Sequence, residues 1–174
     1  MEANALPERL KGVMRRFAAG VTVITSMNAD GGPAGMTATA FTSVSIDPPM
    51  VLVCANAESR TSAAIAEHGS FAVNLLAADD RPLAELFASR AADKFAEIDW
   101  TLEDPGVPVL AAALASVRCR VARTVQAGTH LVYIGEVVGA DSTDGEPLIY
   151  LDGDYRQASA LDRDRSGPPA SDDR

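Results

Sequence analysis

The sequence predicts a mainly β protein, built as one closed β-barrel with helices packed outside it. Several segments are rich in β-branched or apolar residues, while few show helical periodicity. Neither an internal repeat nor a linker divides the middle of the chain. The sequence predicts six or more strands in one domain. Closing their sheet on itself removes exposed strand edges, so a barrel is the expected form.

Composition limits the class of protein. The 174 residues include 47% hydrophobic residues, which is enough for one ordinary core. The formal net charge is −9 and no basic run occurs, so we expect no nucleic-acid partner. The N-terminal residues lack the pattern of a secretory signal, and no window approaches the roughly 18 continuous apolar residues of a membrane span. We therefore expect a cytoplasmic protein with no membrane partner.

The first predicted elements are a helix and a β-hairpin. Apolar residues recur at helical spacing over residues 6–17, with basic residues between them, and Gly20 follows where a helix would stop. Residues 21–26 are rich in β-branched side chains and lead to the turn-forming cluster 28–33. The second strand of the hairpin is expected from Gly35 onward.

That second strand is the most informative stretch of the chain. Residues 35–45 hold small side chains and hydroxyls where a strand normally carries large ones, which leaves room for a flat or anionic ligand near the backbone. An exposed edge strand with a polar face would have the same composition, so this segment alone leaves both interpretations open. The apolar run 50–55 is too short for a stable helix and predicts a strand buried on both faces.

Two more helices are predicted in the middle of the chain. Ser59 is placed to cap a helix over residues 61–67, and the first free amides of such a helix form an anion site, although for an isolated Ser plain capping is the more common explanation. Pro82 opens a further helix over residues 81–90. Residues 91–110 follow no regular pattern and predict a long surface excursion, of the kind that often carries function.

The remaining regular segments are β-rich and predict strands at residues 70–75, 116–125, 130–140 and 147–151. Residues 126–129 are short enough to join two of these strands as a hairpin. The segment 162–174 mixes charge with Ser, Gly and Pro and contains almost nothing apolar. We therefore expect a single domain over residues 1–157, followed by a disordered acidic tail over residues 158–174.

Some chemistry is not expected. Cys54 and Cys119 both lie in apolar or β-like runs and are interpreted as buried small hydrophobes. The only histidines, His68 and His130, are far apart in sequence, and no Cys/His cluster has metal-ligand spacing, so no metal site is predicted. The glycines at 31–32 lack the spacing and the following helix of a dinucleotide-binding loop.

The order of seven segments resembles one known family, the flavin reductases that serve as small partners of two-component flavin-dependent monooxygenases. The matching segments are residues 14–25, 35–49, 59–61, 71–76, 93–95, 128–130 and 147–150. This resemblance implies an FMN-binding split β-barrel, usually a homodimer with flavin near the subunit interface. It also implies NAD(P)H-dependent reduction of free FMN, with FAD possible, NADH as co-substrate, and a separate monooxygenase as partner.

The resemblance also implies site residues. It points to Ser59, Arg60, Thr61 and Lys94 for the flavin phosphate, because phosphate requires hydroxyl and cationic donors. It places Thr37, Ala38, Thr39 and Ala40 along the isoalloxazine, Asn74 near the ribityl chain or ring, and His130 near the nicotinamide. Ser43, Ser45, Ala55 and Phe95 complete the expected flavin site. Residue by residue, alternatives remain: a solvated surface lysine for Lys94, and a satisfied histidine at a strand end for His130. Some members carry an acid where Thr129 stands.

Hydride transfer from nicotinamide C4 to flavin N5 is performed by the two cofactors, so the protein chiefly supplies proximity and stacking. This agrees with the lack of a triad or paired carboxylates in the sequence. Two other functions remain open at this point. One is a non-catalytic flavin carrier or sensor of the same fold, and the other is an oxidase that retains its flavin. The sequence alone does not separate FMN from FAD or NADH from NADPH.

Overall fold

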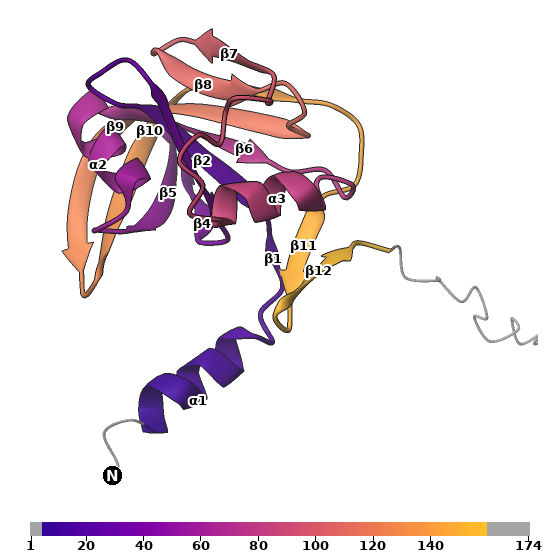
Figure 1. Ribbon diagram of the computed structural model, residues 1–174. Coiled ribbons are helices and arrows are strands. Elements are labelled where there is room, and N and C mark those ends of the chain that lie inside the picture. Colours follow the sequence, from indigo (N-terminus) through magenta and orange to yellow (C-terminus); the bar gives the residue numbers. More distant parts are fainter. Residues whose placement is uncertain (1–4, 160–174) are drawn as a thin grey trace, which may run out of the picture.

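The computed structural model describes residues 5–159, and its centre is an antiparallel seven-stranded sheet (Figure 1). The strands of this sheet are β2 (Thr22–Met27), β3 (Pro33–Ala38), β4 (Phe41–Ile46), β5 (Pro49–Asn56), β6 (Ser70–Leu75), β9 (Ala115–Ala127) and β10 (His130–Ser142). Their spatial order is β3-β2-β6-β9-β10-β5-β4. The predicted mainly β class and both predicted hairpins are confirmed. Residues 160–174 of the predicted tail lie outside the described residues.

The two edge strands of this sheet are neighbours in the chain. β3 and β4 lie at opposite edges, yet only Thr39 and Ala40 join them, so the sheet must roll until its edges approach at that connection. Within residues 5–159 no ladder joins β3 to β4, and the predicted closed barrel is therefore not found. The outer side of β3 is instead occupied by α3 (Arg81–Ala88) and by Lys94, whose ammonium donates to the carbonyl of Gly35 at 3.3 Å.

The rolled sheet has a hydrophobic cluster on each face. Successive side chains of a strand point to opposite faces, and β2 shows this: Val23 and Ile24 are both fully buried, but they belong to different clusters. The cluster under α3 contains Val21, Val23, Leu76, Leu83, Ala84, Phe87, Phe95, Leu110 and Leu148. The cluster inside the roll contains Ile24, Val51, Val53, Ala55, Ile65, Phe71, Val73, Cys119 and Tyr133. β2 and β6 are accordingly buried on both faces along nearly their whole length.

The predicted middle helices are confirmed. α2 (Arg60–His68) has Ser59 as N-cap and ends at Gly69, whose φ of 75° favours glycine. α2 packs against β2 and β3, and Tyr133 reaches it from β10 through a buried hydrogen bond to the carbonyl of Ser62. α3 has a proline in its first turn and buries Leu83, Ala84 and Phe87.

Two predictions need correction. The segment 91–110 is not a purely surface excursion: it contains the hairpin β7 (Trp100–Glu103) and β8 (Val107–Leu110), and Val107 is fully buried. The sequence did not predict this hairpin, because each of its strands has only 4 residues, too few for a clear β pattern. β5 is buried on one face only, since Val51, Val53 and Ala55 point into the roll while the alternate residues are partly exposed.

A second small sheet lies at the base of the molecule. It pairs β1 (Ala19–Gly20) with β11 (Leu148–Leu151), and β11 with β12 (Asp154–Gln157). The predicted opening helix is present as α1 (Ala5–Met14), and Figure 1 shows it standing apart from the rest of the molecule. None of its residues is buried. In the described part of the chain, no helix is long and apolar enough to cross a membrane.

Candidate functional site

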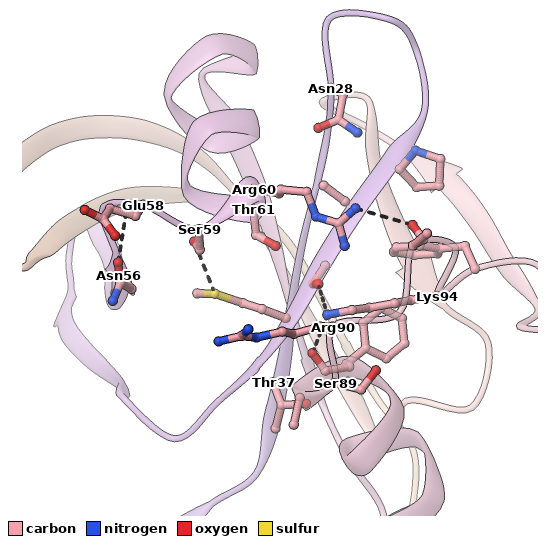
Figure 2. Close-up of a pocket in the computed structure, with 18 residues that line it drawn as sticks. Asn28, Thr37, Asn56, Glu58, Ser59, Arg60, Thr61, Ser89, Arg90 and Lys94 are labelled. Carbon is pink, nitrogen blue, oxygen red and sulfur yellow. Dashed lines mark hydrogen bonds between the residues drawn. The ribbon is translucent and has the colours of Figure 1, made fainter.

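A cavity of about 760 Å³ lies between β3, the start of α2 and the segment that follows α3 (Figure 2). β3 contributes Gly35, Met36 and Thr37, and α2 contributes Arg60 and Thr61. The segment after α3 contributes Ser89, Arg90, Ala92, Lys94 and Phe95. Parts of the chain that are distant in sequence thus form one concave surface, which is the usual form of a small-molecule site.

The charges around this cavity are mostly positive. Arg60, Arg90 and Lys94 line it, whereas Glu58 is the one carboxylate among its lining residues. This balance is opposite to that of the chain, whose formal net charge is −9. The Arg60 guanidinium donates to the carbonyl of Ala91 at 2.8 Å, which holds the segment after α3 against α2. The cavity therefore favours an anionic ligand.

The start of α2 adds neutral donors to these cations. The Ser59 hydroxyl accepts a hydrogen bond from the amide of Ser62 at 3.0 Å. Within the described residues, the amides of Arg60 and Thr61 donate to no acceptor. Free amides at a helix start, together with the positive end of the helix dipole, bind phosphate well. Ser59, Arg60 and Thr61 thus lie at one helix start that faces the cavity, with donors of the kind that suit a phosphate.

Lys94 is held in the wall of the cavity and is not a solvated surface lysine. Its ammonium donates to the carbonyls of Phe87 at 2.7 Å and of Gly35 at 3.3 Å. Burial lowers the pKa of Lys94 below its usual value, and the positive charge of Arg60 lowers it further. An ammonium has three N–H donors, so one remains for a ligand after these two bonds.

Gly35 allows β3 to lie close enough to α3 to form this wall. A Cβ atom at Gly35 would come within 2.6 Å of the Phe87 ring and 3.1 Å of the Phe95 ring. The two rings are themselves in edge contact, with centroids 5.0 Å apart. The absence of a side chain at Gly35 therefore positions both Phe95 and its neighbour Lys94.

Six of the predicted flavin-site residues line the cavity, namely Thr37, Ser59, Arg60, Thr61, Lys94 and Phe95. The other residues of the small-residue stretch continue away from this wall. Ala38 ends β3, Thr39 and Ala40 form the connection to β4, and Ser43 and Ser45 lie on β4. Ala55 is buried in the cluster inside the roll. The structure therefore divides the predicted flavin contacts between the cavity and the β3–β4 connection.

Asn74 is not placed with these residues. Its side chain is fully buried, and its amide nitrogen donates to the carbonyl of Val23 at 3.0 Å and to the hydroxyl of Thr25 at 3.1 Å. Its amide oxygen accepts from the amide of Leu110 at 2.9 Å. Both amide hydrogens are thus used inside the protein, where they join β6 to β2 and β8. The structure thus places Asn74 in the core, and its flavin contact stays a prediction.

His130 lies beside the cavity but does not line it. It is the first residue of β10 and pairs in register with Asn56 of β5, which is a lining residue. Its side chain is exposed, and its Nδ1 atom is 3.0 Å from the hydroxyl of Thr129. The turn before it is held by the amide of Ala57, which donates to the carbonyl of Thr129 at 3.0 Å. An exposed imidazole is therefore fixed next to the rim of the cavity.

The sequence reasoning missed several lining residues, of which Arg90 is the clearest. Figure 2 shows its side chain extending across the cavity below Ser59. The available signal was its position, four residues before Lys94 in an acidic chain with few cations. Asn28, Asn56 and Glu58 were also missed because they lie in turns or at a strand end, where sequence alone does not show the direction of a side chain.

Comparison with known proteins identifies the family to which the chain is similar. The family model described as flavin reductase like domain matches residues 14–159. The chain is 43% identical over 145 residues to the reductase component of 4-nitrophenol 4-monooxygenase/4-nitrocatechol 2-monooxygenase from Rhodococcus opacus, which covers 83% of this chain and 77% of that protein. The chain is also 37% identical over 149 residues to a probable flavin reductase from Rhizobium meliloti. The match covers 86% of this chain but only 48% of that longer protein.

Solved structures show the same fold. The NADH:FAD oxidoreductase SgcE6 from Streptomyces globisporus, in complex with NAD and FAD fragments, superposes with a TM-score of 0.83 at 34% sequence identity. The superposition covers 91% of this chain and 95% of the other. The likeness therefore extends over most of both chains.

Proposed function

This chain belongs to the flavin reductase-like family, and from that premise we propose that it is an NADH-dependent flavin reductase that reduces free FMN and supplies it to a separate flavin-dependent monooxygenase. The observation that carries this proposal is the cavity beside β3. There the free amides of Arg60 and Thr61 and three cationic side chains gather in an otherwise acidic protein. This donor set fits the phosphate of FMN.

Each part of the site then has a role in binding. Ser59, Arg60, Thr61 and Lys94 hold the phosphate, and the β3–β4 connection at Thr39 and Ala40 lies along the ring. Small side chains at this connection let backbone amides approach the polar edge of the ring. FAD fits the same arrangement if its adenylate half extends from the open cavity into solvent.

His130 is proposed to orient the nicotinamide, because it is exposed beside Asn56 at the rim of the cavity. When both molecules are bound, nicotinamide C4 supplies a hydride to flavin N5. The protein itself provides proximity, and it holds the two rings in contact. No nucleophile or acid–base pair of the protein is required, which explains why the cavity is lined by binding groups.

The finer features of the assembly are part of the same proposal. We infer that the rolled sheet is the split barrel of this family, whose edges meet at Thr39 and Ala40 and part where α3 covers β3. We also infer a homodimer, because several large apolar side chains are exposed on the described surface, among them Ile46 at 85% and Phe17 at 68%. A cytoplasmic location stays a prediction from the sequence.

The rate of NADH oxidation by the purified protein, followed by absorbance with and without micromolar FMN, tests the proposal. We expect a rate that appears only with added FMN and saturates with it. Riboflavin, which lacks the phosphate, should need a much higher concentration for the same rate. FMN binding without NADH oxidation would instead establish a flavin carrier or sensor, and retention of one flavin through many turnovers with oxygen would establish an oxidase.

A further inference from the structure

The basic, amphipathic helix α1 has an apolar face that nothing in the described chain covers. Its exposed fractions are 73% for Leu6, 58% for Leu10 and 66% for Val13. An isolated helix of 10 residues is only marginally stable in water, because helices shorter than about 12 to 15 residues do not offset the cost of nucleation. The apolar face of α1 therefore needs a complementary surface.

The attachment of α1 directs it away from its own domain. The carbonyl of Arg15 accepts a hydrogen bond from the amide of Asp152 at 2.8 Å, and the Arg16 guanidinium lies 3.6 Å from the Asp152 carboxylate. Both contacts fix the end of the helix to the turn between β11 and β12. Figure 1 shows that the helix runs from this turn away from the sheet and from α3. Its partner surface is therefore expected on another molecule.

A surface of matching character lies beside α3 on the same chain. It is an open cavity of about 610 Å³, which we call the acidic groove. Its floor includes the partly exposed Leu86 and Ile98, and its rim carries Asp79, Asp80, Glu97 and Asp99. No Lys or Arg is among its lining residues, and Arg81, the nearest in sequence, pairs instead with Glu85 at 2.8 Å.

The charges of the two surfaces are complementary. Residues 5–17 carry Arg9, Lys11, Arg15 and Arg16 but only one acid, Glu8, in a chain whose formal net charge is −9. Within the described residues Arg9 has no ion-pair partner. An apolar stripe flanked by cations thus matches an apolar floor flanked by carboxylates, which favours specific docking.

We propose that α1 docks into the acidic groove of a second copy of this chain. Each copy has one helix and one groove, so two copies related by a two-fold axis exchange helices and leave neither surface open. This inference rests on the homodimer proposed above and specifies which surfaces form it. The acidic groove and the flavin cavity share no lining residue, so dimerisation and NADH oxidation can be measured on separate variants.

Photo-cross-linking of the full chain locates the helix directly. Leu10 is replaced by p-benzoylphenylalanine, and equal amounts of protein labelled with light and heavy nitrogen are mixed and allowed to exchange before irradiation. We expect light–heavy adducts that join α1 to peptides containing Leu86 or Ile98. Adducts confined to light–light and heavy–heavy pairs would mean contact within one chain, and light–heavy adducts at β4 would identify a different interface. Either result overturns the proposal.

Charge reversal provides an independent measurement. Arg9→Glu and Asp99→Lys should each weaken dimerisation in sedimentation equilibrium by about tenfold, since each dimer contains two such contacts. The double variant should recover most of the loss, whereas Arg156→Glu on β12 should change nothing. A dimer that is unaffected by either single reversal would refute helix docking alone. A wild-type protein that stays monomeric would refute the homodimer as well, and NADH oxidation measured in parallel tests the proposed function separately.

Discussion

At the scale of single residues, the structure separates side chains that line the cavity from side chains that hold the fold. Asn74 and Arg60 are both polar residues of the predicted flavin site, but only Arg60 lies in the cavity. The difference follows from where each side chain points. β6 is covered on both faces, so the Asn74 amide completes its hydrogen bonds inside the protein. Arg60 begins a helix whose first turn faces the cavity, so it remains available to a ligand.

The first prediction concerns the phosphate. Arg60→Met should raise the dissociation constant for FMN by about tenfold or more, because a hydrogen bond to a charged group contributes about 1.5–3 kcal/mol. The dissociation constant for riboflavin should barely change, since riboflavin has no phosphate. Both constants are measured by quenching of flavin fluorescence. Arg156→Met, outside the cavity, is the control, and equal losses for the two flavins would mean that Arg60 does not contact the phosphate.

The second prediction concerns the nicotinamide. His130→Ala should lower kcat/KM for NADH by about tenfold, which corresponds to a lost contact of about 1.4 kcal/mol, while FMN affinity stays nearly intact. Steady-state NADH oxidation at saturating FMN measures the effect. His68→Ala is a matched control, because His68 is the only other histidine and ends α2 on the exposed surface. An unchanged rate at low NADH would remove His130 from the site.

The third prediction concerns a buried thiol. Burial raises the pKa of Cys119 to about 12, so the folded state keeps a proton that the unfolded state loses from about pH 8.5 upward. Between these values the folded state binds more protons, and its stability falls as pH rises. Cys119→Ala should therefore show a shallower alkaline loss of stability in urea titrations. Cys54, which is partly exposed, should react with iodoacetamide in the native protein long before Cys119 does.

At the scale of elements, the strong local signals gave correct predictions and the short elements did not. Ser59 and Pro82 mark helix starts because capping and proline geometry act within one turn, and both helices are present. β1 and β12 have 2 and 4 residues and depend on pairing with β11, which no local pattern records. The same limit applies to Arg90, whose place in the cavity follows from the path of the chain after α3.

The fourth prediction tests the packing of β3 against α3. Gly35→Ala should lower the free energy of unfolding by about 1–3 kcal/mol, because the new methyl group overlaps the Phe87 ring. It should also weaken FMN binding by displacing Lys94. Gly20→Ala is the control, since a Cβ atom there meets nothing within 4 Å. A Gly35→Ala protein of wild-type stability would show that the ring moves aside without cost.

At the scale of the whole molecule, stability should be highest at the centre of the sheet. β2 and β6 have neighbours on both sides and buried residues on both faces. Their amides should exchange with deuterium most slowly in the native protein, followed by those of the edge strands β3 and β4. Amides of α1 should exchange fastest at concentrations low enough to keep the protein monomeric. Exchange from β4 as slow as from β2 would indicate a closed barrel in solution.

The mainly β class could be predicted from the sequence, because β-rich runs and turn residues are local signals. The sequence could not predict that β3 and β4 stay unpaired and leave the sheet unclosed. This arrangement depends on α3 and Lys94 occupying the outer side of β3, a contact between segments separated by 59 residues at the Lys94–Gly35 bond. The cavity was predictable in part for the same reason. Ser59, Arg60 and Thr61, the proposed phosphate donors, lie together at one helix start, while the far wall comes from the segment after α3.

The order of strands also has a consequence during synthesis of the chain on the ribosome. β5 pairs with β4 at once, but its other neighbour is β10, and the register joins Asn56 to His130. Until residues of β10 have left the exit tunnel, the outer edge of β5 stays unpaired and the β4–β5 hairpin cannot join the rest of the sheet. The nascent chain is therefore most exposed to aggregation over this interval, and it is the stage at which chaperones would bind.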